Sequence, residues 1–279
     1  MLAVAIVGVG KVGRGLHRAL RRARVRASIV SSKALVRGEI TRKLRANVIV
    51  VAARDGAIAE VARALVEHAL IDRHAVVVHC AGALSAEVLA NVRDACAGVA
   101  QMHPMISFAD PNRPPSLLGG HAHVDGDAVA VHRARALCRA IGLVPRTFPG
   151  LDRVAYHAAA GLVANGAAAL AAAGAELLER AGARKEDTAA MLGPLLRSVA
   201  DNVAALGLPH ALTGPVRRGD AASVKKHLET LAERAPELVS LYLACAQAQL
   251  PMARALGDAR PLAFDEVEHV LVEASSKGR

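Results

Sequence analysis

The chain has 279 residues, of which 53% are hydrophobic and 22% are charged, and its formal net charge is +10. This length predicts two domains, and the composition is that of a globular protein whose core needs neither disulfides nor a metal. The chain contains only two Tyr, three Phe and no Trp. These are too few for a base-stacking platform, so the positive charge does not indicate a nucleic-acid-binding protein.

Four cysteines without a CxxC pair indicate a reducing compartment. The N-terminus has no secretory signal pattern, so we expect a cytoplasmic protein. Residues 158–175 form an uncharged run that is long enough to imitate a membrane span, but most of them are Ala or Gly. Such a run is weakly apolar, and we expect a buried, closely packed helix there and no membrane partner.

The first half of the chain alternates short apolar runs with amphipathic stretches, which is typical of a parallel sheet with crossover helices. The expected strands cover residues 2–7, 27–30, 48–52, 75–79, 99–102, 121–124 and 143–148. The expected helices cover residues 13–24, 57–69, 85–95 and 128–141. Proline-rich residues 110–115 predict an exposed loop, and Pro149-Gly150 predicts a domain boundary.

Beyond this boundary the pattern is helical. The expected helices cover residues 152–180, 186–206, 223–234 and 237–256. Asp220 is expected to cap the third of them, and Pro236 suits the first turn of the fourth. We therefore predict an α/β fold, with a Rossmann-type, mostly parallel, doubly wound sheet in residues 1–149 and an all-helical domain in residues 150–279.

A glycine pattern lies between the first expected strand and the first expected helix, which is the context in which GxGxxG binds a dinucleotide. Gly8 permits the tight turn, Gly10 lets the backbone approach a pyrophosphate, and Gly13 allows the helix to pack closely on the strand. A cation in a first helical turn opposes the helix dipole unless an anion binds there. The predicted cofactor-binding residues of this turn are Gly8, Val9, Gly10, Lys11, Val12 and Gly13.

The charge pattern after this turn distinguishes between the two nicotinamide cofactors. Residues 1–38 contain nine Lys or Arg and no acid. The usual NAD fingerprint includes an acid about 20 residues beyond the glycines, whereas this chain has Ser31, Ser32 and Lys33 there. Their hydroxyl and ammonium groups predict a site for the 2′-phosphate of NADP. The alternative is an ordinary polar loop at this place. For Arg37 the two interpretations are that it joins this cluster or that it only solvates it.

Ligands of such folds meet the carboxyl ends of the strands. Ala53 follows the third expected strand, and His79 and Gly82 lie at the end of the fourth; we predict that all three contact the cofactor. His103 follows the fifth strand and is a candidate proton donor, because imidazole titrates near neutral pH. The two histidines could instead shape a loop or bind a metal. No carboxylate lies at helical spacing from either one to complete a metal site, so no metal is predicted.

The long helix and the segment after the second helix supply further candidates. His157, Gly161 and Asn165 are spaced i, i+4, i+8 and therefore lie along one side of the helix. The two polar residues need partners if they are buried, and a substrate or a second subunit would provide them. Arg218 is suited to bind a carboxylate through two hydrogen bonds. The predicted catalytic residues are His103, His157, Asn165 and Arg218.

Several of these motifs occur in a fixed order: GVGKVGRGL, HCAGALS, HPMISF, VDGD, YHAAAGLVAN and LTGPVRRGD. In that order they resemble a bacterial family of Rossmann-like oxidoreductases with a C-terminal helical domain of unknown function. The family is similar in architecture to pyrroline-5-carboxylate reductases, ketopantoate reductases and 3-hydroxyacid dehydrogenases, with a 6-phosphogluconate-dehydrogenase-like helical domain. The resemblance implies an NADP-binding domain, a helical dimerisation domain and an active site between them.

We therefore expect an NADP-dependent oxidoreductase that transfers hydride to or from a small carbonyl or imine substrate bearing a carboxylate. It is expected to form a homodimer through the helical domain. Reductases of this architecture often use a lysine on the long helix, but this chain has no lysine between Lys43 and Lys185. The alternative is a non-catalytic NADP-binding sensor or scaffold dimer.

Overall fold

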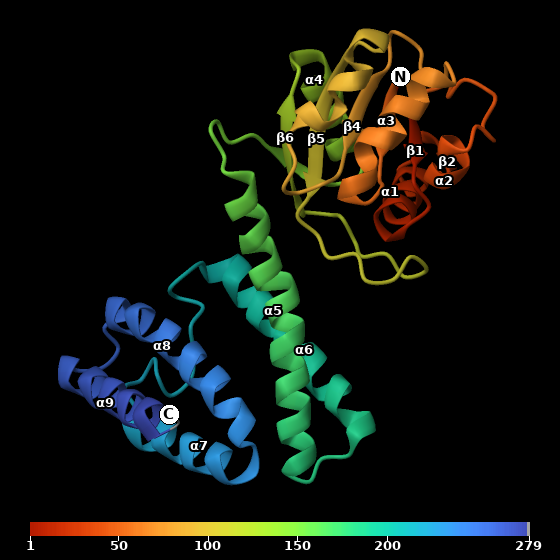
Figure 1. Ribbon diagram of the computed structural model, residues 1–279. Helices are drawn as coiled ribbons and strands as arrows, with labels where there is room; N and C mark the ends of the chain where they lie inside the picture. The colour runs from red at the N-terminus through yellow and green to blue at the C-terminus, as the bar shows by residue number, and fades with distance from the viewer. Residues whose placement is uncertain (278–279) are drawn as a thin grey trace. The chain divides into compact units, whose positions relative to one another are not determined.

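The computed structural model describes residues 1–277 and divides into two compact units, Met1–Ala164 and Asn165–Arg279 (Figure 1). The first unit contains the sheet and the start of the long helix α5 (Arg153–Arg180), and the second unit contains the remaining helices. The division therefore lies within α5, whereas the predicted boundary at Pro149-Gly150 lies just before it.

The first unit is built on one seven-stranded sheet with the order β2-β1-β3-β4-β5-β6-β7. Every neighbouring pair is parallel except β5 and β6, which run antiparallel. The doubly wound, mostly parallel sheet is thus confirmed. Its strands are β1 (Ala3–Val7), β2 (Arg26–Val30), β3 (Val48–Val51), β4 (Val76–His79), β5 (Gly98–Pro104), β6 (His121–Gly126) and β7 (Val144–Arg146).

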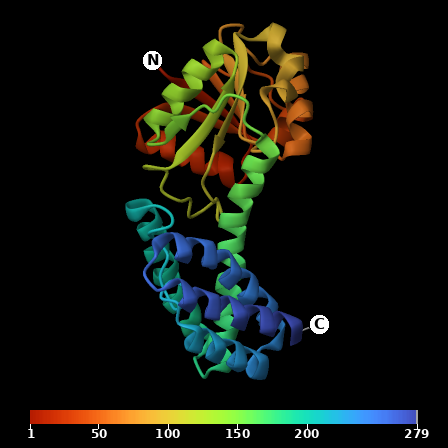
Figure 2. The ribbon, with the colours of Figure 1, turned by 90° about the vertical axis from the view of Figure 1, so that its left-hand side faces the viewer.

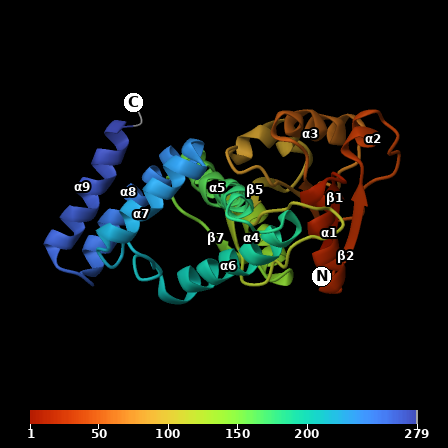
Figure 3. The ribbon, with the colours of Figure 1, turned by 90° about the horizontal axis from the view of Figure 1, so that it is seen from below.

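Helices cover both faces of this sheet, which explains why its central strands are apolar at every position (Figure 3). Along β1, Val4 and Ile6 pack towards α1 and α4, whereas Ala5 and Val7 pack towards α2 and α3. The helical segments of the unit are α1 (Lys11–Arg22), α2 (Ser32–Val36), the 3₁₀ turn η1 (Asp55–Ala57), α3 (Ile58–Glu67), the 3₁₀ segment η2 (Ala86–Ala95) and α4 (Ala128–Ala140).

The two outer strands differ from the central ones. In β2, Arg26 and Ser28 are exposed. At the other edge, β7 has only three residues, and the middle one is Pro145. Neither edge offers a long apolar strand.

The second unit has its own core, formed by α7, α8 and α9, which Figures 1 and 2 both draw side by side. Large apolar side chains such as Val224, Leu243, Phe264 and Leu271 pack together there. The Asp220 cap is confirmed, because its carboxylate accepts a hydrogen bond from the Ser223 amide (3.0 Å). The elements after α5 are α6 (Lys185–Leu206), α7 (Ala221–Arg234), η3 (Pro236–Leu238), α8 (Val239–Leu256) and α9 (Pro261–Lys277).

Helices α5 and α6 depart from the expectation of burial. No residue of α5 is buried in the single chain, and Thr188 is the buried residue of α6. The prediction of a closely packed helix over residues 158–175 is therefore wrong for the chain alone. Among the described residues, α5 is the one helix that is long and apolar enough to cross a membrane. This is a statement of length and composition alone, and no residue of α5 is buried.

Candidate cofactor and substrate site

The glycine turn between β1 and α1 has the geometry that its spacing predicts. Gly8 has a φ of +134°, and a Cβ there would lie 2.2 Å from the Ala52 carbonyl oxygen. A Cβ on Gly13 would lie 1.9 Å from the Gly8 carbonyl oxygen. The Gly8 amide donates to the Val30 carbonyl (2.8 Å), so the turn is tied to the end of β2. Both glycines are therefore required by the fold itself.

Gly10 differs from its two neighbours in the motif. No atom lies within 4 Å of the position that its Cβ would occupy, and its φ is −75°. Gly10 is also the N-cap of α1, a helix without an acid in its first turn. Open space beside backbone at a helix N-terminus suits an anionic group. The structure thus leaves room at the position where the motif places a pyrophosphate.

The basic residues near this turn divide into engaged and free cations. The Arg14 guanidinium donates to the Val9 carbonyl (2.9 Å), whereas Lys11 is exposed. Arg37 forms an ion pair with Glu39 (2.5 Å), so its charge is already compensated. This surface ion pair with Glu39 is not among the two interpretations of Arg37, which are membership of the predicted phosphate cluster and solvation of it.

Ser31, Ser32 and Lys33 lie directly after β2, where a helix begins instead of the loop named as the alternative. Ser31 is the N-cap of α2, and its hydroxyl oxygen accepts a hydrogen bond from the Ala34 amide (3.3 Å). The hydroxyl proton stays available for a second partner. Because Val30 bonds to Gly8, this segment lies beside the glycine turn. Ala53, a predicted cofactor contact, is partly buried just after β3.

His79 is fully buried, and the backbone satisfies both of its ring nitrogens. Nε2 lies 3.0 Å from the Ser85 carbonyl, and Nδ1 accepts from the Ala81 amide (3.2 Å). A carbonyl only accepts, so Nε2 carries the proton. Burial lowers the pKa of His79 to about 4. The side chain therefore holds the loop after β4, and a cofactor contact at this position would have to come from the backbone.

The adjacent Cys80 is equally unsuited to nucleophilic chemistry, because burial raises the pKa of its thiol to about 12. The thiol is therefore protonated at neutral pH, and a thiol in that state is a poor nucleophile.

His79 makes stability depend on pH. Between pH 6.5 and 4 the unfolded chain protonates this imidazole while the folded chain does not, so stability falls as the pH falls through that range. The expected loss from His79 alone is about 3 kcal/mol. Urea unfolding at a series of pH values measures it. His79→Asn should flatten the dependence, and the exposed-site control His132→Asn should not; equal slopes in all three proteins would contradict the assignment.

A second cluster lies where the end of β5 meets the first turns of α5. Nδ1 of His103 lies 3.2 Å from the Tyr156 hydroxyl, and the rings of His103 and His157 meet edge to face at 5.7 Å. Both imidazoles lie over Gly82, since a Cβ there would be 2.3 Å from His157 Nδ1 and 3.0 Å from His103 Nε2. The structure thus brings together three predicted site residues, His103, His157 and Gly82.

The protonation state of His103 refines its predicted role. Burial, followed by the neighbouring histidines, lowers the pKa of His103 to about 4. At neutral pH the ring is therefore uncharged, and it forms its hydrogen bond with the Tyr156 hydroxyl as a neutral group. These surroundings disfavour the charged imidazolium form of His103.

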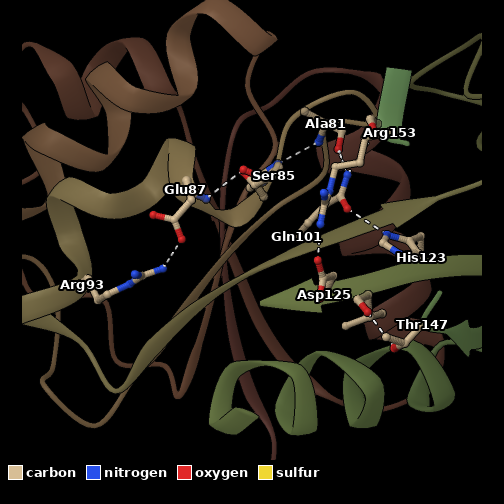
Figure 4. Close-up of polar contacts among 12 residues, drawn as sticks. Ala81, Ser85, Glu87, Arg93, Gln101, His123, Asp125, Thr147 and Arg153 are labelled. Atoms are coloured by element: carbon tan, nitrogen blue, oxygen red, sulfur yellow. Dashed lines mark hydrogen bonds and ion pairs between the residues drawn. The ribbon is translucent and has the colours of Figure 1, made fainter. Parts of the chain in front are cut away.

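A polar network on the same face of β5 and β6 extends this cluster (Figure 4). The buried Gln101 amide donates to the carbonyls of Ala81 (2.7 Å) and Gly82 (3.0 Å), and its oxygen lies 2.9 Å from His123 Nδ1. The network continues through Asp125, which forms an ion pair with Arg153 at the start of α5. These contacts fix the loop that carries Gly82.

Sequence reasoning did not select Gln101, His123, Tyr156 or Arg153 as site residues. Gln101 and His103 alternate on one strand, so they share a face, and this signal was available. His123 lies opposite His103 because of the register between β5 and β6. No local sequence pattern predicts that register. Among residues 1–277, no group of three His, Cys, Asp or Glu side chains is arranged to hold a metal ion.

Two predicted catalytic residues belong to the other unit. Asn165 is its first residue, on α5, and Arg218 lies in the segment before α7. Both side chains are exposed, as is that of His157. His157 and Asn165 are therefore not buried in the single chain, and the need for partners that burial would impose does not arise there. Neighbouring Arg217 is engaged, since it pairs with Asp258 (2.5 Å).

Comparison with solved structures shows the same fold in several oxidoreductases. A candidate NADP oxidoreductase from Bacteroides fragilis has a TM-score of 0.68 at 21% identity, covering 89% of this chain and 97% of that one. A protein from Thermotoga maritima has a TM-score of 0.66 at 24% identity, covering 91% and 99%. Pyrroline carboxylate reductase from Plasmodium falciparum, with NADP bound, has a TM-score of 0.57 at 11% identity, covering 100% and 98%.

Comparison of sequences adds a match to one family. No curated protein sequence matches the chain significantly. Residues 121–249 match the family described as Domain of unknown function (DUF2520). This match covers less than half of the chain, and the structural neighbours show the fold of the chain.

Proposed function

We propose that this chain is an NADP-dependent oxidoreductase that transfers hydride to or from a small carbonyl or imine substrate bearing a carboxylate. The observation that carries the proposal is the turn at residues 8–13, where Gly8 and Gly13 serve the fold while Gly10 leaves open space at a helix N-terminus. Ser31 and Lys33 beside that turn would hold the 2′-phosphate. The neighbour with NADP bound supports the choice of cofactor.

The bound nicotinamide would supply the hydride chemistry, so the protein's share is orientation and proton movement. In this proposal His103 and His157 meet the substrate over Gly82, where both rings already converge. Tyr156 holds the His103 ring through a hydrogen bond at Nδ1. Asn165 orients the substrate, and Arg218 binds its carboxylate.

The proposal includes a cytoplasmic homodimer that forms through the helical unit. Its support is an apolar stripe on α6, where Met191, Leu195, Val199 and Val203 recur every four residues and are 42–57% exposed. A helix of this length gains most of its stability from packing of such a stripe. The molar mass of the purified protein in solution tests this part.

Turnover tests the proposal against the sensor alternative. NADPH should raise the unfolding temperature more than NADH does, and a panel of keto and imino acids should then reveal NADPH oxidation. His157→Ala and Asn165→Ala should keep the NADPH affinity of the parent protein and lose about 10²-fold or more of its turnover. NADPH binding without turnover on any substrate would favour the sensor, and absence of NADPH binding would refute both.

A further inference from the structure

Two polar atoms of the β5–β6 network are buried without a hydrogen-bond partner among residues 1–277: Nε2 of His123 and Nε of Arg153. His123 is only 2% exposed. Buried polar atoms in folded proteins almost always have a partner. Two orphans in one network therefore point to a group that comes from outside the chain.

The hydrogen bonds around Gln101 determine what His123 offers. The NH₂ group of Gln101 must face the carbonyls of Ala81 and Gly82, because a carbonyl only accepts. Its oxygen then faces Nδ1 of His123 at 2.9 Å, so Nδ1 carries the proton. Burial lowers the pKa of His123, and the ring stays neutral. Nε2 is consequently a fixed acceptor with a free lone pair.

Arg153 offers the complement. Its Nε–H can only donate, while its terminal nitrogen pairs with Asp125, which compensates the charge. Arg153 lies close enough to His123 for its charge to lower the pKa of that ring, and Figure 4 shows the two side chains next to Gln101. The network thus offers one hydrogen-bond donor, the Nε–H of Arg153, and one acceptor, Nε2 of His123. The charge of Arg153 is compensated by Asp125.

We propose that His123 Nε2 and Arg153 Nε form a subsite for an uncharged group that both donates and accepts a hydrogen bond, namely a hydroxyl or a primary carboxamide. A carboxylate only accepts, so it would leave Nε2 unpaired and face its lone pair. An ammonium only donates, so it would face the Arg153 N–H. This inference rests on the proposed function. It assigns the subsite to a second polar group of the substrate, apart from the substrate carboxylate.

Phe148 stacks on His123 beside this subsite. Its ring is parallel to that of His123 (7°, centroids 6.0 Å apart) and is 50% exposed. It belongs to the connection between β7 and α5.

The test uses the full chain, labelled with ¹⁵N at histidine and saturated with NADPH. This sample is titrated separately with propionamide, 1-propanol and propionate. The Nε2 resonance of His123, assigned by its loss in His123→Phe, should show an unprotonated nitrogen. It should shift with the amide or the alcohol and not with propionate. Arg153→Lys keeps the charge beside Asp125 but removes the Nε donor, and it should weaken binding of the effective probe about fivefold. The exposed-site control Arg146→Lys should not.

A protonated Nε2, a propionate response equal to that of the amide and the alcohol, or no response to any probe would overturn the subsite; the last outcome would mean that only water pairs these atoms. If Arg153→Lys fails to fold, the comparison of the three probes on the parent protein still decides. Repeating the titration without NADPH separates the two proposals. A His123 response in a protein that binds no NADPH would refute the proposed function and leave the subsite standing.

Discussion

Replacing Gly13 with alanine should destabilise the sheet unit by about 2–4 kcal/mol, while Gly10→Ala should cost about 1 kcal/mol at most. The added methyl on Gly13 meets the Gly8 carbonyl oxygen at 1.9 Å, so α1 must move away from β1. The same methyl on Gly10 meets no atom within 4 Å. It occupies the space assigned to the pyrophosphate, and NADPH affinity should fall by about tenfold or more.

Urea unfolding and NADPH calorimetry on both variants measure the two effects separately. Gly193→Ala is the matched control, since that glycine lies within α6 with open space around its Cβ position. It should leave NADPH binding unchanged. A Gly10→Ala protein that binds NADPH as tightly as the parent would show that the cofactor does not approach this turn.

Ser31→Asp should reverse the cofactor preference. Aspartate caps helices as well as serine does, so the hydrogen bond from the Ala34 amide and the start of α2 should persist. The new carboxylate repels a 2′-phosphate and accepts a hydrogen bond from a 2′-hydroxyl. One lost charge-assisted contact together with this repulsion should weaken NADPH binding by about 10²-fold, while NADH binding tightens.

Calorimetry with both reduced nucleotides checks this reversal. Ser31→Asn, which caps the helix without a charge, should give an intermediate preference. Equal weakening of both nucleotides would mean that the segment contacts the cofactor but does not read the phosphate.

Much of the fold could be predicted because its signals are local. Each central strand is an apolar run, and the glycine turn has a fixed spacing, so β1, β3 and β4 lie within one or two residues of their expected bounds. The five residues of α2 are too few to show a helical period, and the polar Ser31 and Ser32 favoured a loop. No helix was predicted over the residues of α9, although Phe264 and Val267 belong to the core of the helical unit.

The candidate site was harder to predict because it depends on pairing across the sheet. His79 stands at the expected place for a functional histidine, yet the backbone occupies both of its nitrogens. His123 lies opposite His103 in the antiparallel pair of β5 and β6, and this register cannot be read from the local sequence pattern of either strand. Gln101 and Arg153 gain their roles only through these neighbours.

The outer strands of the sheet determine how copies of this chain can associate. An open edge recruits another chain when it presents a long row of free amides and carbonyls. Pro145 has no amide hydrogen and interrupts that row in β7, while exposed Arg26 places a positive charge on β2, where a second copy would bring a like charge. Strand-to-strand polymerisation is therefore disfavoured at both ends, and self-association is directed to helical surfaces.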